Sequence, residues 1–263
     1  MYGNTIKTDQ KNHEPVIRNA TFRFYEELNE HLPRKNRRKS FRQSFRGKPS
    51  IKNLIESIGV PHSEVDMILV DGKSVDFNYQ MLGGEYVSVY PVFESLDISP
   101  IIRLRAKPLR EIKFVVDVNL GKLAGKLRLL GFDTLFRNNL EDDEIREIAS
   151  NEKRIILTRD KALLIHNLVT HGYWIRNEDP KLQLREVVER LQLKNSFKPF
   201  SRCTSCNESL QKTTREEVKT LLPEDTLRFY DTFWECRGCG QLYWQGSHYQ
   251  RINELIDKLK NGA

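Results

Sequence analysis

Three aspartates, Asp117, Asp143 and Asp160, each follow a predicted β-strand near the point where a helix begins. In a parallel sheet the carboxyl ends of the strands meet at one edge, so all three carboxylates are expected there. Clustered carboxylates repel one another unless a hard cation such as Mg²⁺ or Mn²⁺ neutralises them. The three residues therefore predict a divalent-metal site, and cleavage of a phosphodiester is the first chemistry to consider.

Short apolar runs rich in β-branched residues predict the strands that carry these acids. The runs at 113–116 and 154–158 are too short for helices and have the composition of strands buried inside a parallel sheet. Two further strands are expected at 134–136 and 173–175. Helical patterns separate these runs. Strands that alternate with helices predict an α/β fold with a parallel sheet and right-handed crossovers.

Helical spacing predicts the elements between the strands. Leucines recur at this spacing over 120–130, which predicts a helix. Gly131 is expected to end this helix by adopting a left-handed conformation. The next helix is expected to begin at Asp142 or Asp143 as its N-cap, and another covers 162–168. With helices flanking the sheet, ligands bind beyond the carboxyl ends of the strands.

The motifs around these acids occur in the order found in a known family. They are Asp117 with Leu120, Gly121, Leu123, Ala124, Leu127 and Arg128, the run Leu130–Thr134, the triplet Asp143–Ile145 and the run Ile156–Asp160. Through them, the chain from about Leu109 to its C-terminus resembles the Mut-seven carboxy-terminal ribonuclease family, which has a PIN-like nuclease fold. Asn119 departs from the apolar residue expected at its position.

The resemblance implies a metal-dependent ribonuclease that needs no nucleophilic side chain. Asp117 and Asp160 are expected to be direct ligands of Mg²⁺ or Mn²⁺. Asp143 is expected to be a further ligand or an acid that positions water, and Asp142 competes with it for this role.

Some of these acids have structural alternatives. Asp143 and Asp179 stand where helices begin, so each could cap its helix instead. A fourth carboxylate is expected from Glu178 or Asp179, which follow the fourth strand at the same edge. Asp117 follows an apolar strand and has fewer structural reasons to be acidic, which favours a functional role.

Four cysteines form the most specific single motif. Cys203 and Cys206 make one Cys-x-x-Cys pair, and Cys236 and Cys239 make the other. Four thiolates in two such pairs suit a tetrahedral structural Zn²⁺. Disulfides are the alternative, which the absence of a recognisable signal peptide disfavours. The long spacer around Pro223 predicts a hairpin or small insertion between the pairs.

Basic and aromatic residues are candidates for contacts with RNA. The segment containing Trp244 and His248 resembles the end of the family's sequence, and its residue types suit stacking on unpaired bases and contact with phosphate. Packing against the ribbon is the alternative for Trp244, and a structural hydrogen bond is the alternative for His248. The other candidates are Lys122, Lys126 and Arg128, for which a solvated helix face is the alternative, and Arg159.

The first third of the chain has a different pattern. Strands are expected at 21–25, 40–46 and 67–70, with a helix over 51–58 and a last strand at 84–91. This order and the short motifs within it resemble the ubiquitin-like β-grasp fold of the ThiS and MoaD sulfur carriers. The last strand runs on into another domain, whereas a sulfur carrier needs a diglycine terminus. The resemblance therefore implies an adaptor that binds a protein partner.

A basic segment lies within this part of the chain. It has no acid between Glu30 and Glu56, and Arg37 and Arg38 are its representative RNA-binding candidates. Such segments bind phosphates with little sequence preference, and a solvated loop is the alternative. Phe41 and Phe45 alternate with its arginines and are expected to face the core. A second basic stretch contains Arg103, Arg105, Lys107 and Arg110.

Composition is compatible with a multidomain nucleic-acid-binding protein. The 263 residues are 38% hydrophobic and 30% charged, with a net charge of +7. No run approaches the ~18 apolar residues of a membrane span, and cysteines kept as thiols suit the cytoplasm. The expected parts are a flexible tail (1–17), a ubiquitin-like domain (18–95), a basic linker (96–110), a PIN-like nuclease domain (111–198), and a zinc ribbon with a C-terminal helix (199–263).

Two functional hypotheses follow from the sequence. In the first, the protein is a metal-dependent ribonuclease that acts on structured RNA or at the ribosome. In the second, it is an RNA-binding or ribosome-associated module that uses a nuclease-like fold for docking. The three carboxylates favour the ribonuclease, because a binder of phosphates has no need to hold acids at the phosphate-facing edge.

Overall fold

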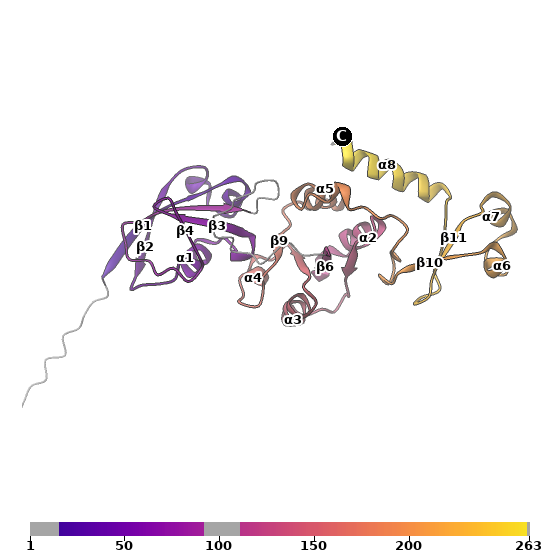
Figure 1. Cartoon of the computed structure of the whole chain (residues 1–263), viewed down its shortest axis with the longest axis horizontal. Coiled ribbons are helices and arrows are strands. Elements are labelled where there is room, and N and C mark those ends of the chain that lie inside the picture. The colour runs from indigo at the N-terminus through magenta and orange to yellow at the C-terminus, as the bar shows by residue number, and fades with distance from the viewer. Residues whose placement is uncertain (1–15, 92–110, 262–263) are drawn as a thin grey trace, which may run out of the picture. The chain divides into compact units, whose positions relative to one another are not determined.

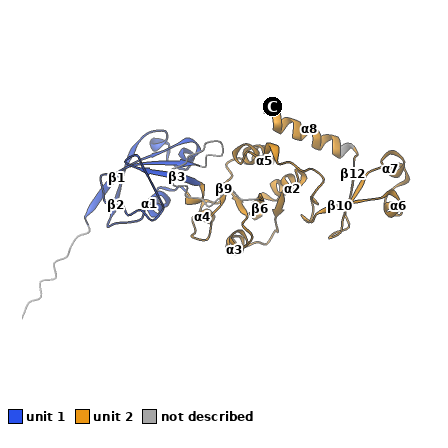
Figure 2. Ribbon diagram, viewed as in Figure 1, with its two compact units in different colours: residues 1–60, 65–92, 97–104 blue, residues 61–64, 93–96, 105–263 orange. Residues whose placement is uncertain are grey.

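A computed structural model describes residues 16–91 and 111–261, except for the side chains of residues 247 and 248. The chain divides into two compact units (Figure 2). The first contains residues 1–60, 65–92 and 97–104, and the second contains 61–64, 93–96 and 105–263. The expected linker at 96–110, with its four basic residues, and nearly all of the expected tail lie outside the described residues.

The first unit contains a mixed five-stranded sheet. Its strands are β1 (Ile17–Phe24), β2 (Phe41–Arg46), β3 (Val65–Val70), β4 (Lys73–Val75) and β5 (Tyr86–Pro91). They lie in the order β2-β1-β5-β3-β4, with β1 and β5 parallel and the other pairs antiparallel. This is the β-grasp arrangement that the order of the predicted elements implied.

Helix α1 (Ile51–Ile58) packs on one face of this sheet. The Ser50 side chain accepts the Asn53 N–H at the start of the helix, and Gly59 ends it with a φ of 104°. Phe45 is buried in the core of this unit and Phe41 packs against that core. The prediction that these two rings face inward is confirmed.

The second unit contains a four-stranded parallel sheet. Its strands are β6 (Lys113–Val116), β7 (Asp133–Leu135), β8 (Ile155–Thr158) and β9 (Gly172–Trp174), and they lie in the order β7-β6-β8-β9. Each was predicted to within about one residue. The chain leaves β6 for β7 on one side and later returns to β8 on the other, so the strand order reverses between β6 and β8.

Helices cover both faces of the parallel sheet (Figure 1). One core joins the sheet to α2 (Gly121–Leu129) and α5 (Pro180–Arg190), and includes Phe114. The other core includes Val115 and joins the sheet to α3 (Asp142–Glu152) and α4 (Lys161–Leu164). The neighbouring residues of β6 thus point to opposite cores, which explains its continuous apolar run.

A three-stranded antiparallel sheet follows. It is formed by β10 (Leu210–Thr213), β11 (Phe233–Cys236) and β12 (Leu242–Trp244). The predicted insertion around Pro223 consists of two short helices, α6 (Arg215–Val218) and α7 (Glu224–Phe229).

The last helix, α8 (Ser247–Asn261), contributes to the core around α2 and α5. Its residues Ile256 and Leu259 are buried in that core. None of the helices in the described ranges has the length and apolar character of a membrane-spanning segment.

Two helix boundaries differ from prediction. The N-cap of α3 is Glu141, so Asp142 and Asp143 lie inside its first turn, where acidic side chains favour the helix dipole. Helix α4 ends at Leu164, because Ile165 leaves the helical conformation and Leu168 is exposed. Apolar residues over 162–168 suggested a longer helix than the chain forms.

Candidate active site and metal site

Asp117 and Asp160 stand at the carboxyl ends of two adjacent strands. Asp117 follows β6, its N–H donates to the Leu157 carbonyl of β8 at 3.0 Å, and its side chain is buried. Asp160 lies just after β8 and caps α4, with its Oδ1 accepting the Ala162 N–H at 2.8 Å. Because the strand order reverses between β6 and β8, both acids lie where ligands of open α/β sheets bind.

Thr158 connects these two acids. This last residue of β8 is fully buried, and its hydroxyl donates to Oδ2 of Asp117 at 2.7 Å. The same hydroxyl oxygen accepts the backbone N–H of Asp160 at 2.9 Å. One side chain thus orients the Asp117 carboxylate and holds the turn that carries Asp160.

Thr158 has a role that sequence reasoning missed. It lies within the run that suggested the strand, but a threonine is common in strands and draws no attention there. The available signal was a hydroxyl at a buried strand end two residues before an acid. Such a residue often hydrogen-bonds the backbone two positions ahead.

The structure does not bring Asp143 to the other two acids through any described interaction. Its side chain is 89% exposed, and it pairs with Arg146 at 2.6 Å. Asp142 is also exposed and lies 3.7 Å from the same arginine. Both acids therefore stand as partners of Arg146, each through one carboxylate oxygen.

The acids after β9 have structural partners. The Asp179 side chain caps α5 by accepting the N–H groups of Lys181 and Leu182, and these bonds hold the pKa of Asp179 below its usual value. Glu178 pairs with Arg159 at 2.7 Å. The capping alternative is confirmed for Asp179, and Arg159 is engaged by an acid beside the proposed site.

The four cysteines converge. All four Sγ atoms lie within 4.8 Å of one another, and no other group of three or more candidate ligands among the described residues meets this criterion. Cys203 and Cys239 have their Sγ atoms 3.5 Å apart, and Cys206 and Cys236 have theirs 3.3 Å apart. These spacings suit four thiolates around one ion with metal–sulfur bonds of about 2.3 Å.

The two Cys-x-x-Cys loops have matching backbones. Asn207 and Gly240 each follow the second cysteine of a pair, and both have left-handed φ angles, 71° and 74°. Each donates its N–H to the carbonyl of the first cysteine of its pair, Cys203 or Cys236. The loops thus curl in the same way and present their sulfur atoms to a common centre.

Tyr243 supports the first loop. Its hydroxyl lies 3.2 Å from Sγ of Cys203 and accepts the Thr204 N–H at 3.0 Å. Burial raises the pKa of the Cys203 thiol, but the Tyr243 hydroxyl and the backbone N–H groups of Cys206 and Ser205 outweigh this effect and lower the pKa to about 6. At Cys203 this favours the thiolate form that a metal requires. At Cys206 and Cys239 the backbone N–H groups of Glu208 and Gln241 act to lower the pKa, but burial and hydrogen bonds to neighbouring cysteine sulfurs outweigh them and raise it.

Comparison with known families assigns both parts of the chain. A family model described as the Mut7-C RNase domain matches residues 112–256, more than half of the chain, and one described as Mut7-C ubiquitin matches residues 17–97. The chain belongs to the Mut7-C ribonuclease family. No match was found among curated proteins or among solved structures. The Mut7-C RNase domain supports a nuclease-related role that involves RNA, and the cysteines could bind a structural metal such as zinc.

One expectation for the Mut7-C domain needs correction. Arg128 was a candidate for contact with RNA, but it is only 5% exposed. Its guanidinium donates to the carbonyls of Thr134 and Ser205 at 2.9 and 2.6 Å, and more weakly to that of Thr204. A buried cation whose donors are used in this way holds the first cysteine loop against β7 and does not contact phosphate.

Asp133 and Asn207 complete this link within the Mut7-C domain. The Asn207 side chain accepts the Thr134 N–H and donates to Oδ1 of Asp133, both at 2.8 Å. Asp133 also accepts from Arg154 at 2.7 Å and pairs with Arg202. The cysteine loop is thereby tied to the edge strand of the nuclease sheet.

The remaining RNA-binding candidates keep accessible positions where they are described. Lys122 is exposed and Lys126 is half-buried on α2. Trp244 is half-buried on β12, and His248 belongs to α8 but its side chain is outside the described set. In the first unit, Arg37 and Arg38 are exposed.

Proposed function

We propose that the chain is a metal-dependent ribonuclease whose divalent cation is held by Asp117 and Asp160. The observation that carries this proposal is the Thr158 bridge, which fixes two carboxylates at the point where the strand order reverses. Membership of a ribonuclease family supports the substrate class. The basic charge of the protein also supports a nucleic-acid substrate, and we propose structured or ribosomal RNA.

The residues at this point fit Mg²⁺ or Mn²⁺. Among the described residues, each carboxylate has one oxygen in a positioning hydrogen bond, Oδ2 for Asp117 and Oδ1 for Asp160. The other oxygen of each remains to bind a hard cation, which prefers oxygen ligands and retains several waters. We place Asp143, or Asp142 in its stead, as a further ligand or an acid that positions water, through the carboxylate oxygen that does not pair with Arg146.

Each residue has a distinct role in the proposed reaction. A bound divalent cation would polarise the scissile phosphate and lower the pKa of an attacking water. Thr158 keeps the Asp117 carboxylate directed by donating to its Oδ2. Lys122 and Lys126 on α2, together with Arg159, would bind phosphates of the RNA backbone and orient the strand.

We propose that the four cysteines hold Zn²⁺ in a structural role. Four sulfur ligands fill a tetrahedral shell and leave no position for water or substrate. Retention of the four thiolates requires a reducing environment, and we therefore place the protein in the cytoplasm. We propose that the ubiquitin-like unit also recruits a protein partner, an adaptor role that complements RNA cleavage.

Cleavage and binding assays on the same variants test the nuclease assignment. The wild-type protein is expected to cleave labelled RNA with Mn²⁺ or Mg²⁺, whereas Asp117→Asn and Asp160→Asn abolish cleavage and retain RNA binding. Asp225→Asn, an exposed aspartate on α7, is the matched control and should cleave normally. Unchanged cleavage by the first two variants would refute the site. Tight binding by the wild type without cleavage in either metal would favour an RNA-binding module instead.

A further inference from the structure

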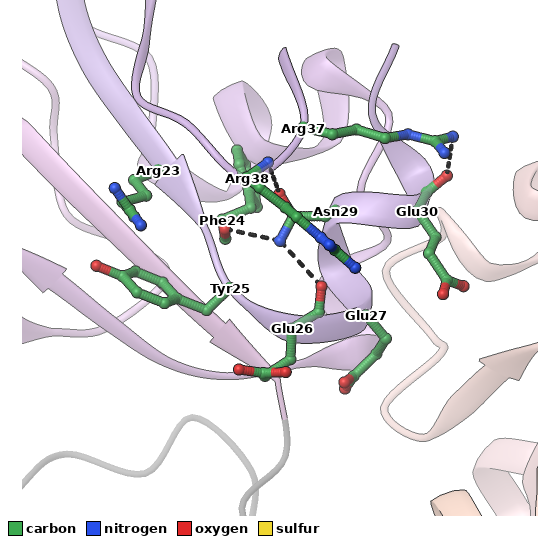
Figure 3. Close-up of a pocket in the computed structure, with 9 residues that line it drawn as sticks. All are labelled: Arg23, Phe24, Tyr25, Glu26, Glu27, Asn29, Glu30, Arg37 and Arg38. Atoms are coloured by element: carbon green, nitrogen blue, oxygen red, sulfur yellow. Dashed lines mark hydrogen bonds between the residues drawn. The ribbon is translucent and has the colours of Figure 1, made fainter. Parts of the chain in front are cut away.

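A pocket of about 880 Å³ lies in the ubiquitin-like unit, far along the sequence from the proposed active site. Its lining includes Arg23 and Tyr25, which lie together on the left of Figure 3, and Arg38. The acids Glu26 and Glu27 line it as well. Its volume falls in the range of sites that hold small molecules.

The wall of this pocket is preformed by Asn29. The buried Asn29 side chain donates to the carbonyls of Phe24 and Glu26, both at 2.9 Å, and accepts the Arg38 N–H at 2.6 Å. Glu26 and Arg38 both have left-handed φ angles, 44° and 57°. Backbone strain of this kind persists where the surroundings enforce it and gathers at ligand sites.

Arg23 and Tyr25 form one side of the pocket, and Tyr90, which is not part of the lining, packs on Tyr25. The rings of Tyr25 and Tyr90 lie 4.2 Å apart and nearly parallel, and the Arg23 guanidinium lies 5.2 Å from the Tyr25 ring centre. Nε of Arg23 is buried, and no hydrogen-bond acceptor for it is present among the described residues. Aromatic rings and arginine planes are the surfaces on which unpaired bases stack.

The charges in the pocket suit a base better than a bare phosphate. The lining contains three arginines, Arg23, Arg37 and Arg38, and three glutamates, Glu26, Glu27 and Glu30. A phosphate alone gains little from such a balanced set of charges. Carboxylates can accept hydrogen bonds from the amino groups on the edge of a base.

Phosphate-binding groups are plentiful just outside the pocket. The segment that supplies Arg37 and Arg38 continues into β2, and its other basic side chains include exposed residues at Arg34, Lys35, Lys39, Arg42, Arg46 and Lys48. An RNA strand could place one base in the pocket while its phosphates follow this segment. Base recognition and charge neutralisation would then belong to different residues.

We propose that this pocket binds an unpaired nucleotide of the RNA. The base stacks beside Tyr25 and Arg23, its edge meets the glutamate carboxylates, and the adjoining phosphates lie on the basic segment. The proposal rests on the proposed function only for the identity of the nucleic acid as RNA. It adds a sequence-reading site to a unit for which charge alone indicates non-specific binding.

Binding of mononucleotides to the full chain tests this site without cleavage. AMP, CMP, GMP and UMP are added separately to the protein without Mg²⁺ or Mn²⁺, and ligand-observed saturation-transfer NMR reports contact with base protons. At least one nucleotide is expected to bind, and inorganic phosphate at the same concentration should not displace it. Arg23→Gln should weaken this binding about fivefold or more, in line with the loss of a stacking group.

Arg46→Gln is the matched control, because it removes the same charge from an exposed position of β2 outside the pocket. On a single-stranded RNA decamer, Arg46→Gln should lower the salt dependence of binding by about 0.7 in log–log slope, because it removes a phosphate contact. Arg23→Gln should leave this slope unchanged, because Arg23 contacts the base. Of these two variants, only Arg23→Gln should weaken nucleotide binding. Arg23→Lys keeps the charge without the planar group, so it should lose base contact as well. Thermal melts identify any variant that fails to fold. If Arg23→Gln fails, Arg38→Asn replaces it as the pocket variant, because Arg38 lines the pocket and asparagine tolerates its left-handed φ angle.

The results separate this proposal from the nuclease assignment. If no mononucleotide binds the wild-type protein, or if Arg46→Gln weakens nucleotide binding as much as Arg23→Gln, the pocket is not a nucleotide site. RNA cleavage by that same protein would leave the nuclease assignment intact. Conversely, nucleotide binding by a wild-type protein that never cleaves RNA would support the pocket and refute the nuclease.

Discussion

The hydroxyl of Thr158 lies 2.7 Å from Oδ2 of Asp117 and joins the ends of two parallel strands. Because the same oxygen also accepts the Asp160 N–H, a single neutral side chain connects both acids that we assign to the metal. Thr158, which was not expected to be a ligand, thus determines the positions of Asp117 and Asp160.

Replacement of Thr158 tests this positioning role. Thr158→Val keeps the shape but removes the hydroxyl, so we expect cleavage or metal affinity to fall about 10- to 100-fold, as for other residues that orient metal ligands. Unfolding should become easier by about 1–3 kcal/mol, because the Asp117 and Asp160 groups lose a buried partner. Mn²⁺ titrations of cleavage and urea unfolding measure the two effects.

Thr158→Ser is the control for this prediction, since it keeps the hydroxyl and should retain most of the activity. Wild-type Mn²⁺ affinity and rate in Thr158→Val would show that the hydrogen bond to Asp117 does not position the metal ligand.

Removal of zinc should affect more than the cysteine loops. We expect one Zn²⁺ per chain by elemental analysis, loss of it in Cys236→Ser, and a lower melting temperature for that variant. The nuclease sheet should lose stability too, because Asn207 and Arg128 tie the first cysteine loop to β7. Faster hydrogen exchange of the β7 amides would reveal this loss of stability. Unaltered exchange there after zinc loss would contradict the proposed coupling between the cysteine loop and β7.

Two glycines should respond to alanine in opposite directions. Gly131 has a φ of 93°, and an added Cβ would lie 2.0 Å from the Lys198 carbonyl oxygen, so Gly131→Ala should prevent stable folding or lower the melting temperature sharply. Gly125 lies within α2 with no atom within 4 Å of an added Cβ. Gly125→Ala should therefore stabilise the protein by about 0.5–1 kcal/mol. Thermal melts of both variants provide the comparison, and similar destabilisation by both would refute the argument.

Acid should weaken the link at Asp133. Burial acts to raise the pKa of Asp133, but hydrogen bonds from Arg154 and Asn207 and the charges of Arg154 and Arg202 lower it overall. A lowered pKa means that the stabilisation is complete above the unfolded value of about 3.9 and is lost as the pH falls through the folded value. Asp133→Asn should thus be less stable than wild type at pH 7.

The difference between Asp133→Asn and wild type should shrink below about pH 4. Urea unfolding at a series of pH values, with bound zinc measured at each, checks this prediction. A difference that stays constant down to pH 3 would show that the charge of Asp133 is not the stabilising feature.

The fold could be predicted from the sequence where the signal was local. Strands β6 and β8 are continuous apolar runs because both of their faces are buried, and Gly131 ends a helix because it adopts a left-handed conformation. The paired cysteines predicted a cluster because their spacing already fits a metal.

The unpredicted features depend on partners far away in the sequence. Arg128 resembles an exposed helical cation, but its acceptors at Thr204 and Ser205 lie more than 70 residues further along the chain. The ion pair between Asp143 and Arg146 is local, but the choice between pairing an arginine and binding a metal depends on the arrangement of strands β6 and β8. The spacing of apolar residues carries no information about the burial of Arg128 or about the partner of Asp143.

The attachment of the cysteine loop to β7 limits how the gene can be trimmed. A protein that ends after residue 198 would retain the nuclease sheet but would lose the Asn207 acceptor for Thr134 and the carbonyls that hold Arg128. It would also lose Ile256 and Leu259 from the core. The smallest active piece should therefore reach through α8, and sheet, ribbon and final helix should be inherited and transplanted together.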